Sequence, residues 1–553
     1  MHGTVSVGAG KSIGFRRIPV EITVAICLVL ALQVAMVLTK AINWDEFWYY
    51  SQISQFAAGS LNDPLQTFHV RLFGWLRLLP GSGIDHIIVA RMVMLCCALV
   101  SAVAIMGVAR RFTPDRTAAL AALTYLTGGF AFQHDFAFRT DPMTAALLMT
   151  ALWAMLCRVW NGRTIVAVAF LLAIATMLTI KVVLYVPAFA GVVWLRWTEA
   201  PDRRQFIARL AAIGAIGSAA FAALFAWHQA GLASGAIGDA RAVLATSSQK
   251  MFSSGIIPHP DVLLKQLAIA PFLTAMIVLF PLTWLRSPRP AAECVALAGL
   301  ILPLATTLFY RNSHPYYYGF ILPPVAAALA ISIELLRQRF GMVLLGSSLI
   351  ANAAVLSAIE PRDVLPRQRA LLAATKQIFP RPVAYFDSCA MLGDYPRPII
   401  FLTQWGLELY REAGQPQFVE AMARQPVPLL VANHRALRAA LAGRSIAEGL
   451  LPRDAAVLHD NFIPHWGPLW VAGKRFARGG EAQPFVIAVP GLYTVEGFPL
   501  QIDGTSAPVG AVITLARGRH IVGVRSGLAT LRWGDHLPVP TQPVPSGSLF
   551  TDF

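Results

Sequence analysis

Residues 20–52 read VEITVAICLVLALQVAMVLTKAINWDEFWYYSQ, so two adjacent acids, Asp45 and Glu46, follow directly after a long apolar run. The run, residues 20–38, has about the length that crosses the hydrocarbon core of a bilayer. It is long for a signal peptide and has no small-residue cleavage site, so we predict an uncleaved anchor helix. The paired acids therefore lie where the chain leaves the membrane.

The composition indicates a polytopic membrane protein with a soluble portion. Of the 553 residues, 56% are hydrophobic and 13% are charged, whereas soluble domains carry roughly a quarter charged residues. The net charge of +16 is better explained by arginines in cytoplasmic loops than by nucleic-acid binding. Five of the six cysteines lie in apolar stretches, which excludes a disulfide framework and a CxxC-type metal site.

Long apolar runs recur along the first two thirds of the chain. We predict about eleven spans, at residues 20–38, 87–108, 118–132, 143–160, 165–180, 182–195, 206–227, 267–284, 291–309, 318–336 and 342–356. Alternate connections are rich in arginine, and the others carry acids, histidines and aromatic residues. The positive-inside rule then places the N-terminus in the cytoplasm, and long loops 40–86 and 228–266 outside.

The character of the sequence changes after residue 360, where hydrophobicity becomes intermittent and prolines cluster. We predict a transmembrane module at 1–358, an extracytoplasmic α/β region at 359–480 and an extracytoplasmic β-rich region at 481–553. The last region alternates short apolar runs with Gly and Asp turns, a pattern typical of a β-sandwich.

Ionisable residues collect in the predicted outer segments. Arg139 and Asp141 lie in FQHDFAFRTDP, and Lys181 separates two apolar runs. A late segment, RNSHPYYYG, adds the candidates Arg311, His314 and Tyr317. Ionisable groups at membrane depth are costly and usually face a cavity or a partner. Their joint placement on one membrane face therefore favours a functional site there.

Each candidate also has a structural explanation. The two acids can be solvated loop residues within an aromatic interface belt, and Lys181 can extend to the surface from a helix end. Arg139 and Asp141 can simply pair across a turn, and His314 can belong to the belt. Adjacent acids usually diverge in direction, so one catalytic and one supporting carboxylate is favoured over a joint metal site.

Four segments resemble motifs of polyprenyl-phosphate-sugar-dependent glycosyltransferases of the GT-C fold, such as the lipid A aminoarabinose transferases and the protein O-mannosyltransferases. WDEFWYYSQ is similar to the DE-x-x-Y-Y type motif of their first outer loop, and FRTDPMTAALLM to their R-x-D segment. TIKVVLYVPAF and HPYYYGFILPPVAAALA resemble the later Lys-containing and His/Pro/Tyr segments. IKVV replaces the usual Lys-Gly-Pro of the aminoarabinose transferases, which leaves the acceptor open.

The resemblance implies a GT-C membrane fold and inverting sugar transfer, with Asp45 as general base and Glu46 as the second catalytic acid. Contacts to the donor phosphate are expected from Arg139, Lys181, Arg311 and His314. Contacts to the sugar or acceptor are expected from Tyr49, Asp141 and Tyr317. No metal-ligand set is predicted, and whether a divalent cation assists is left open.

The expected partners are a polyprenyl-phosphate sugar, membrane lipids and a lipid, glycan or protein acceptor, with no nucleic acid. The expected location is a bacterial inner membrane, with the C-terminal domain outside the cytoplasm. Two alternatives remain at this stage. One is a transporter or flippase of a lipid-linked saccharide, although no inverted repeat is present in the sequence. The other is a non-enzymatic envelope assembly protein.

Overall fold

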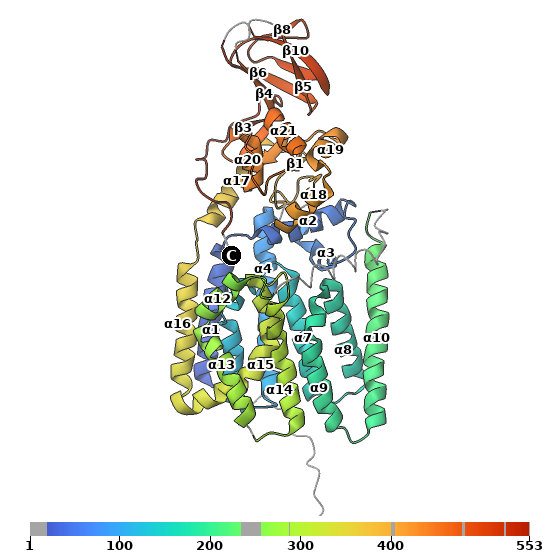
Figure 1. Cartoon of the computed structure of the whole chain (residues 1–553), viewed down its shortest axis with the longest axis vertical. Helices are drawn as coiled ribbons and strands as arrows, with labels where there is room; N and C mark the ends of the chain where they lie inside the picture. Colours follow the sequence, from blue (N-terminus) through green and yellow to red (C-terminus); the bar gives the residue numbers. More distant parts are fainter. Residues whose placement is uncertain are drawn as a thin grey trace, which may run out of the picture.

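The computed structural model describes residues 19–233, 256–286, 288–399, 404–477, 482–524 and 527–551. A bundle of long helices carries a smaller domain of helices and strands at one end (Figure 1). Part of the predicted outer loop 228–266, and the basic segment before the first span, lie outside the described residues.

The bundle confirms the prediction of a multi-pass helical membrane protein. Its helices are α1 (Val20–Thr39), α4 (Gly83–Ala109), α5 (Asp115–Leu126), α7 (Thr140–Cys157), α8 (Gly162–Leu178), α9 (Val186–Thr198), α10 (Arg203–Gln229), α12 (Pro260–Ile269), α13 (Pro271–Arg286), α14 (Ala291–Ile301), α15 (Pro315–Phe340) and α16 (Met342–Ile359). Among the described residues, eight helices are long and apolar enough to cross a membrane, or nine if α12 and α13, bent by 100°, form one span. The prediction was about eleven. All eleven predicted runs fall on helices, but α5 and α8, with 12 and 17 residues, are short.

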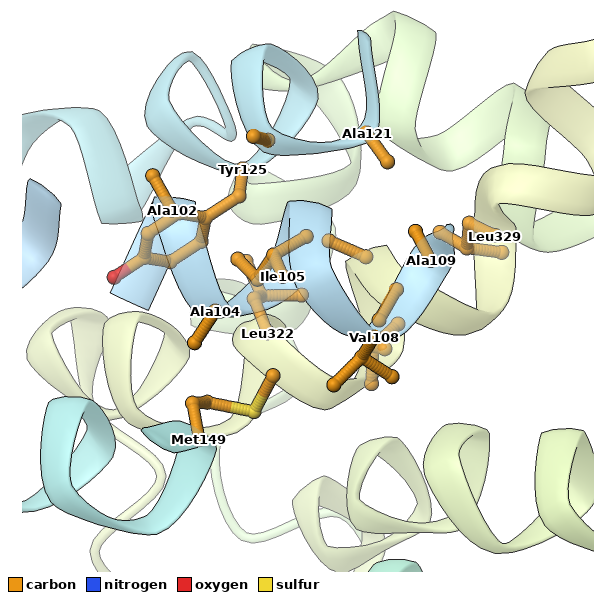
Figure 2. Packing of buried hydrophobic residues seen from close by; sticks show 14 of the residues in the cluster. Ala102, Ala104, Ile105, Val108, Ala109, Ala121, Tyr125, Met149, Leu322 and Leu329 are labelled. Atoms are coloured by element: carbon orange, nitrogen blue, oxygen red, sulfur yellow. The ribbon is translucent and has the colours of Figure 1, made fainter. Parts of the chain in front are cut away.

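Helix α15 forms the centre of the bundle and α10 its edge. Of the apolar window of α15, 83% of the residues are buried, against 11% for α10. Helix α15 packs against α4, α5 and α7. Figure 2 shows Ile105 of α4 beside Leu322 of α15, with alanines such as Ala102 and Ala121 among the residues buried where these helices meet. Close approach through small residues is the usual way in which membrane helices associate.

Helices α2 (Trp44–Ala57) and α3 (His69–Phe73) lie at the end of the bundle that faces the C-terminal domain (Figure 1). Two further short elements are α6 (Phe130–His134) and the 3-10 helix η1 (Gly74–Leu78). The 3-10 helices η2 (Ile180–Tyr185) and η3 (Leu302–Leu308) are continuous with α9 and α14, and each forms one candidate span with that helix. Helix α2 begins with a capping box, in which the Asn43 side chain accepts from the Asp45 backbone N–H and Glu46 accepts from the Asn43 N–H. The box fixes the first turn of α2, and with it both acids.

The C-terminal domain combines helices with two sheets. Its helices are α17 (Val364–Ile378), α18 (Gln404–Ala413), α19 (Gln417–Arg424), α20 (Arg435–Leu441) and α21 (Pro452–Asn461). Its strands are β1 (Tyr385–Phe386), β2 (Leu429–Val431), β3 (Phe462–Trp466), β4 (Leu469–Phe476), β5 (Gln483–Ile487), β6 (Gly491–Glu496), β7 (Leu500–Ile502), β8 (Thr505–Ala507), β9 (Val512–Leu515), β10 (Gly518–Val524) and β11 (Ala529–Trp533).

One sheet has the strand order β1-β2-β4-β11-β6-β9, with β3 also on β4, and the other has β5-β10-β7-β8. Only β1 and β2 pair in parallel among the described strands. Because β4 pairs with β11, the first sheet joins the chain before and after residue 480. The domain boundary at that residue stays a prediction.

Candidate active site

Four charged side chains form one cluster at the end of the bundle beside the C-terminal domain. Asp45, in the first turn of α2, forms an ion pair with Arg139, which precedes α7. Arg139 Nε lies 3.2 Å from Asp141 Oδ2, and Lys181 Nζ lies 2.5 Å from Asp141 Oδ1. Three segments far apart in the sequence thus form a chain of ion pairs in which acids and cations alternate, from Asp45 through Arg139 and Asp141 to Lys181.

The two acids of the cluster differ in exposure and in partners. The Asp45 side chain is 16% exposed and has one cation, whereas Asp141 is 3% exposed and has two. Asp141 therefore holds Arg139 and Lys181 in place from the inside. Of the two acids, Asp45 is the more accessible to a ligand.

Two tyrosines flank the cations of the cluster. The guanidinium carbon of Arg139 lies 3.4 Å from the ring centroid of Tyr316, and Lys181 Nζ lies 5.4 Å from it, which are cation–π distances. Tyr49 lies on the other side, with its hydroxyl 3.5 Å from Thr140 Oγ1. Burial raises the pKa of Tyr49 above its ordinary value, so its hydroxyl stays protonated. The recess between Tyr49 and Arg139 is too narrow for water.

Glu46 points away from the cluster into a second, fully buried site. Its two oxygens accept from Arg91 Nε and Nη2 at 2.7 and 2.6 Å, from the Phe138 N–H at 2.7 Å and from the Asn43 N–H at 2.9 Å. Glu46 and Arg91 are each 1% exposed. With both oxygens occupied, Glu46 has no capacity left for a substrate, so the structure does not support a direct catalytic contact.

Arg91 is a residue that the sequence analysis missed. Besides Glu46, its guanidinium donates to the carbonyls of Val37, Lys40 and Ala41, where α1 ends. It therefore joins α1, α2 and α4 at one point. Through Glu46 it also reaches the Phe138 N–H, one residue before Arg139. A single charge inside the apolar run 87–108 was the signal available in the sequence.

Three further candidates lie outside the ion-pair cluster. Arg311 pairs with Glu408 of α18 at 2.9 Å and so contacts the C-terminal domain. Tyr317 is fully buried, with its hydroxyl 2.5 Å from Thr306 Oγ1 and its ring stacked on that of Tyr310. Tyr316, not Tyr317, is the tyrosine of this segment that contacts the cations.

His314 caps α15 and packs against the ring of His259, with centroids 4.2 Å apart. Burial, with His259, Arg139 and Lys181 nearby, lowers the pKa of His314 to about 3. It is therefore neutral at physiological pH and adds no positive charge to the site. Among the described residues there is no group of three or more His, Cys, Asp or Glu side chains that could hold a metal ion.

This bundle, with an acid–cation cluster at the end that carries the C-terminal domain, has the GT-C fold, which it shares with two solved membrane proteins. The fold that the sequence motifs predicted is thereby confirmed. ArnT from Cupriavidus metallidurans, solved with bound undecaprenyl phosphate, superposes with a TM-score of 0.54 at 14% identity, over 77% of this chain and 95% of that one. The apo form of the same ArnT superposes with a TM-score of 0.51 at 13% identity, and the match covers 76% of this chain and 94% of that one.

The Archaeoglobus fulgidus oligosaccharyltransferase, in its apo form, is similar in fold as well. Its TM-score is 0.52 at 13% identity, and the match covers 76% of this chain and 69% of that one. No protein-family model and no curated protein sequence matches the chain. The similarity is therefore one of fold, and the chemistry has to be argued from the site.

Proposed function

We propose that the chain is a membrane glycosyltransferase that transfers a sugar from a polyprenyl-phosphate donor to an acceptor on the side of the C-terminal domain. The observation that carries this proposal is the joint placement of Asp45, Arg139, Asp141 and Lys181 at the end of a GT-C bundle. The cluster supplies a reachable carboxylate beside two fixed cations. Inverting transfer from a lipid phosphate needs both of these.

The ion pair between Asp45 and Arg139 suggests how donor binding prepares the base. An ion-pair partner lowers the basicity of a carboxylate. A donor phosphate that engages Arg139 and Lys181 replaces Asp45 as the partner of Arg139, because phosphate accepts two guanidinium hydrogen bonds. Asp45 then regains its basicity at the moment when the donor is in place.

In the transfer step, Asp45 accepts the proton of the acceptor hydroxyl as that oxygen attacks the anomeric carbon. The bond from the anomeric carbon to the phosphate oxygen breaks on the opposite face, so the configuration inverts. The polyprenyl phosphate leaves with an added negative charge, which Arg139 and Lys181 stabilise. Asp141 keeps these two cations oriented throughout.

The other residues take supporting roles in this proposal. Glu46 and Arg91 position the first turn of α2 and the segment before Arg139. Tyr49 borders the site and remains the proposed hydrogen-bond donor to sugar or acceptor, which requires the recess between Tyr49 and Arg139 to widen when the substrate binds. His314 serves as a neutral hydrogen-bond donor to the phosphate, and Arg311 holds the C-terminal domain against the bundle.

We also propose a bacterial inner-membrane location, with the C-terminal domain outside the cytoplasm. Arginine-rich connections support this orientation, because they meet at the end of the bundle opposite the C-terminal domain (Figure 1). There Arg111 pairs with Glu199 and with Glu293, so the connections after α4, α9 and α13 lie together.

The test is transfer in proteoliposomes supplied with radiolabelled undecaprenyl-phosphate hexoses and pentoses and with lipid, glycan and peptide acceptors. We expect Asp45→Asn to lower the transfer rate by about 10²- to 10⁴-fold, with unchanged expression and gel-filtration profile. Asp63→Asn, an exposed acid in the same segment, is the matched control. Retained transfer by Asp45→Asn contradicts the role of Asp45. Donor movement across the bilayer without any transfer by the wild type favours a flippase.

A further inference from the structure

A second pocket, of about 330 Å³, lies in the C-terminal domain and shares no residue with the Asp45 cluster. Helix α20 supplies Arg438, Asn433 lies two residues after β2, and β4 supplies Trp470. The turn between β3 and β4 adds Gly467, and the C-terminal segment adds Leu549. The volume is at the lower end of the range for small-molecule sites.

The acid nearest to the lining residue Asn433 is Asp387, and it is paired with an arginine. The pocket lies at the carboxyl ends of the parallel strands β1 and β2, where α/β sheets usually bind ligands. Asn433 accepts from the Ser388 N–H at 3.0 Å and donates to Asp387 at 3.2 Å. Asp387 is in turn neutralised by Arg397, 2.9 Å away. Its negative charge therefore does not oppose an anion in the pocket.

Arg438 gives the pocket its charge. Within the described parts of the chain its guanidinium has no acidic partner, whereas its neighbour Arg435 pairs with Glu448. His434 adds no charge, because burial and the two arginines lower its pKa to about 4. An exposed, uncompensated guanidinium in a pocket binds carboxylate or phosphate, since its planar N–H groups match their oxygens.

Trp470 lines the pocket with an indole that is only partly buried. A flat indole and a cation that line the same pocket suit a ligand that has an apolar ring face, hydroxyl groups and one negative charge. We propose that this pocket binds an anionic saccharide, that is, a sugar unit bearing a carboxylate or a phosphate. That the ring is a sugar rests on the proposed function, whereas the need for an anion rests on Arg438.

The C-terminal segment that walls the pocket also contacts the helix that carries Asp45. Arg367 donates to the carbonyls of Ser546 and Ser548 at 3.1 and 2.9 Å, and Gln368 donates to that of Leu549 at 2.8 Å. The Phe550 ring then meets Trp44 edge-on, with centroids 6.0 Å apart. The saccharide site therefore lies against the segment that braces α2.

The experiment is calorimetric titration of the full-length protein in nanodiscs with glucuronic acid, glucose 6-phosphate, methyl glucoside and inorganic phosphate. We expect both anionic sugars to bind and methyl glucoside to bind at least about tenfold more weakly, because one charged hydrogen bond is lost. Arg438→Ala and Trp470→Leu are each expected to weaken the anionic sugars by about tenfold or more. Arg435→Ala, on the same helix but outside the pocket, is the matched control.

Two further arms separate this site from the proposed donor site. Asp45→Asn and Arg139→Met are expected to leave glucuronic acid binding unchanged, so a failure of the transferase proposal does not affect this result. If inorganic phosphate binds as tightly as glucose 6-phosphate, the pocket is a general anion site, and the proposal that it recognises a saccharide is overturned. The proposal is overturned altogether if neither anionic sugar binds. It is also overturned if Arg438→Ala and Trp470→Leu both leave the affinity for these sugars unchanged.

Discussion

Asp45 and Glu46 are adjacent in the sequence but belong to two different ionic sites. The cluster of Asp45, Arg139, Asp141 and Lys181 is partly open, and its outer acid has a single partner. The pair of Glu46 and Arg91 is closed, with both side chains 1% exposed and both carboxylate oxygens bonded. One turn of helix α2 thus points Asp45 at the Arg139 cluster and Glu46 at Arg91 in the interior.

The two sites are therefore expected to have different roles. The closed site of Glu46 and Arg91 positions helix α2, and the open site, the Asp45 cluster, takes part in the proposed reaction. A buried ion pair with every oxygen occupied cannot exchange a partner without exposing an uncompensated charge, which is expensive. The Asp45 carboxylate is partly exposed and can be hydrated when it separates from Arg139, so exchange of its partner is expected to cost less. Substitutions in the closed site are therefore expected to affect folding, and those in the open site to affect the rate of transfer.

The largest effect is expected from Arg91→Met. The substitution leaves Glu46 charged and buried and removes the donors to the carbonyls at the end of α1. We expect a loss of about 3 to 5 kcal/mol in the free energy of unfolding, measured by thermal denaturation of the purified protein in detergent. The double variant Arg91→Met with Glu46→Leu is expected to recover part of that loss. Wild-type stability of Arg91→Met would show that the closed site is not a structural joint.

Lys181→Met tests the open site, where we expect a substitution to lower the transfer rate and to leave stability nearly unchanged. The substitution keeps the length of the side chain and removes the charge that is proposed to stabilise the leaving phosphate. We expect the transfer rate to fall by about 10²- to 10³-fold, with stability nearly unchanged, because Asp141 keeps Arg139 as a partner. Lys265→Met, a lysine near Phe130 that is not in the cluster, is the control. A folding defect in Lys181→Met without a rate defect would make Lys181 part of the scaffold.

His69 is a buried ionisable group that has no acidic partner within the described ranges of the chain. Its side chain is 2% exposed, and its Nε2 lies 3.1 Å from the Tyr49 carbonyl of α2. Burial lowers the pKa of His69 to about 4, below that of the unfolded chain. The unfolded state therefore binds the proton first, so stability is lost as the pH falls from about 6.5 to about 4.

The loss attributable to His69 is expected to reach about 3 kcal/mol at pH 4. The measurement is the melting temperature of wild type and His69→Gln between pH 7 and pH 4. A Gln side chain can keep a donor to the Tyr49 carbonyl but has no charge to gain. We expect the variant to lose less stability than the wild type on acidification. Parallel pH curves for the two proteins would show that His69 is not the group responsible.

The sequence predicted the helices and the open site better than the closed one. All eleven predicted apolar runs fall on helices, and the motifs pointed to Asp45, Arg139 and Lys181, which the structure brings into one cluster. The role of Arg91 could not be predicted, because its partners lie in α1 and α2 and are known only from the fold. Tyr316 was missed in favour of Tyr317 for a similar reason. Neighbouring residues on a helix point about 100° apart, and only the packing of α15 decides which one faces the cations.

The smallest effect is expected from Arg311, the candidate that the structure places with the C-terminal domain. Its pair with Glu408 is more than one-third exposed on both sides, and such pairs contribute about 0 to 1 kcal/mol. Arg311→Ala is therefore expected to leave the transfer rate within about twofold of the wild type and to lower stability by at most about 1 kcal/mol. Glu408→Ala should match it in both measurements, because each variant removes the same pair. If Arg311→Ala slows transfer a hundredfold while Glu408→Ala does not, Arg311 binds the donor phosphate, and the open site extends beyond the four residues of the cluster.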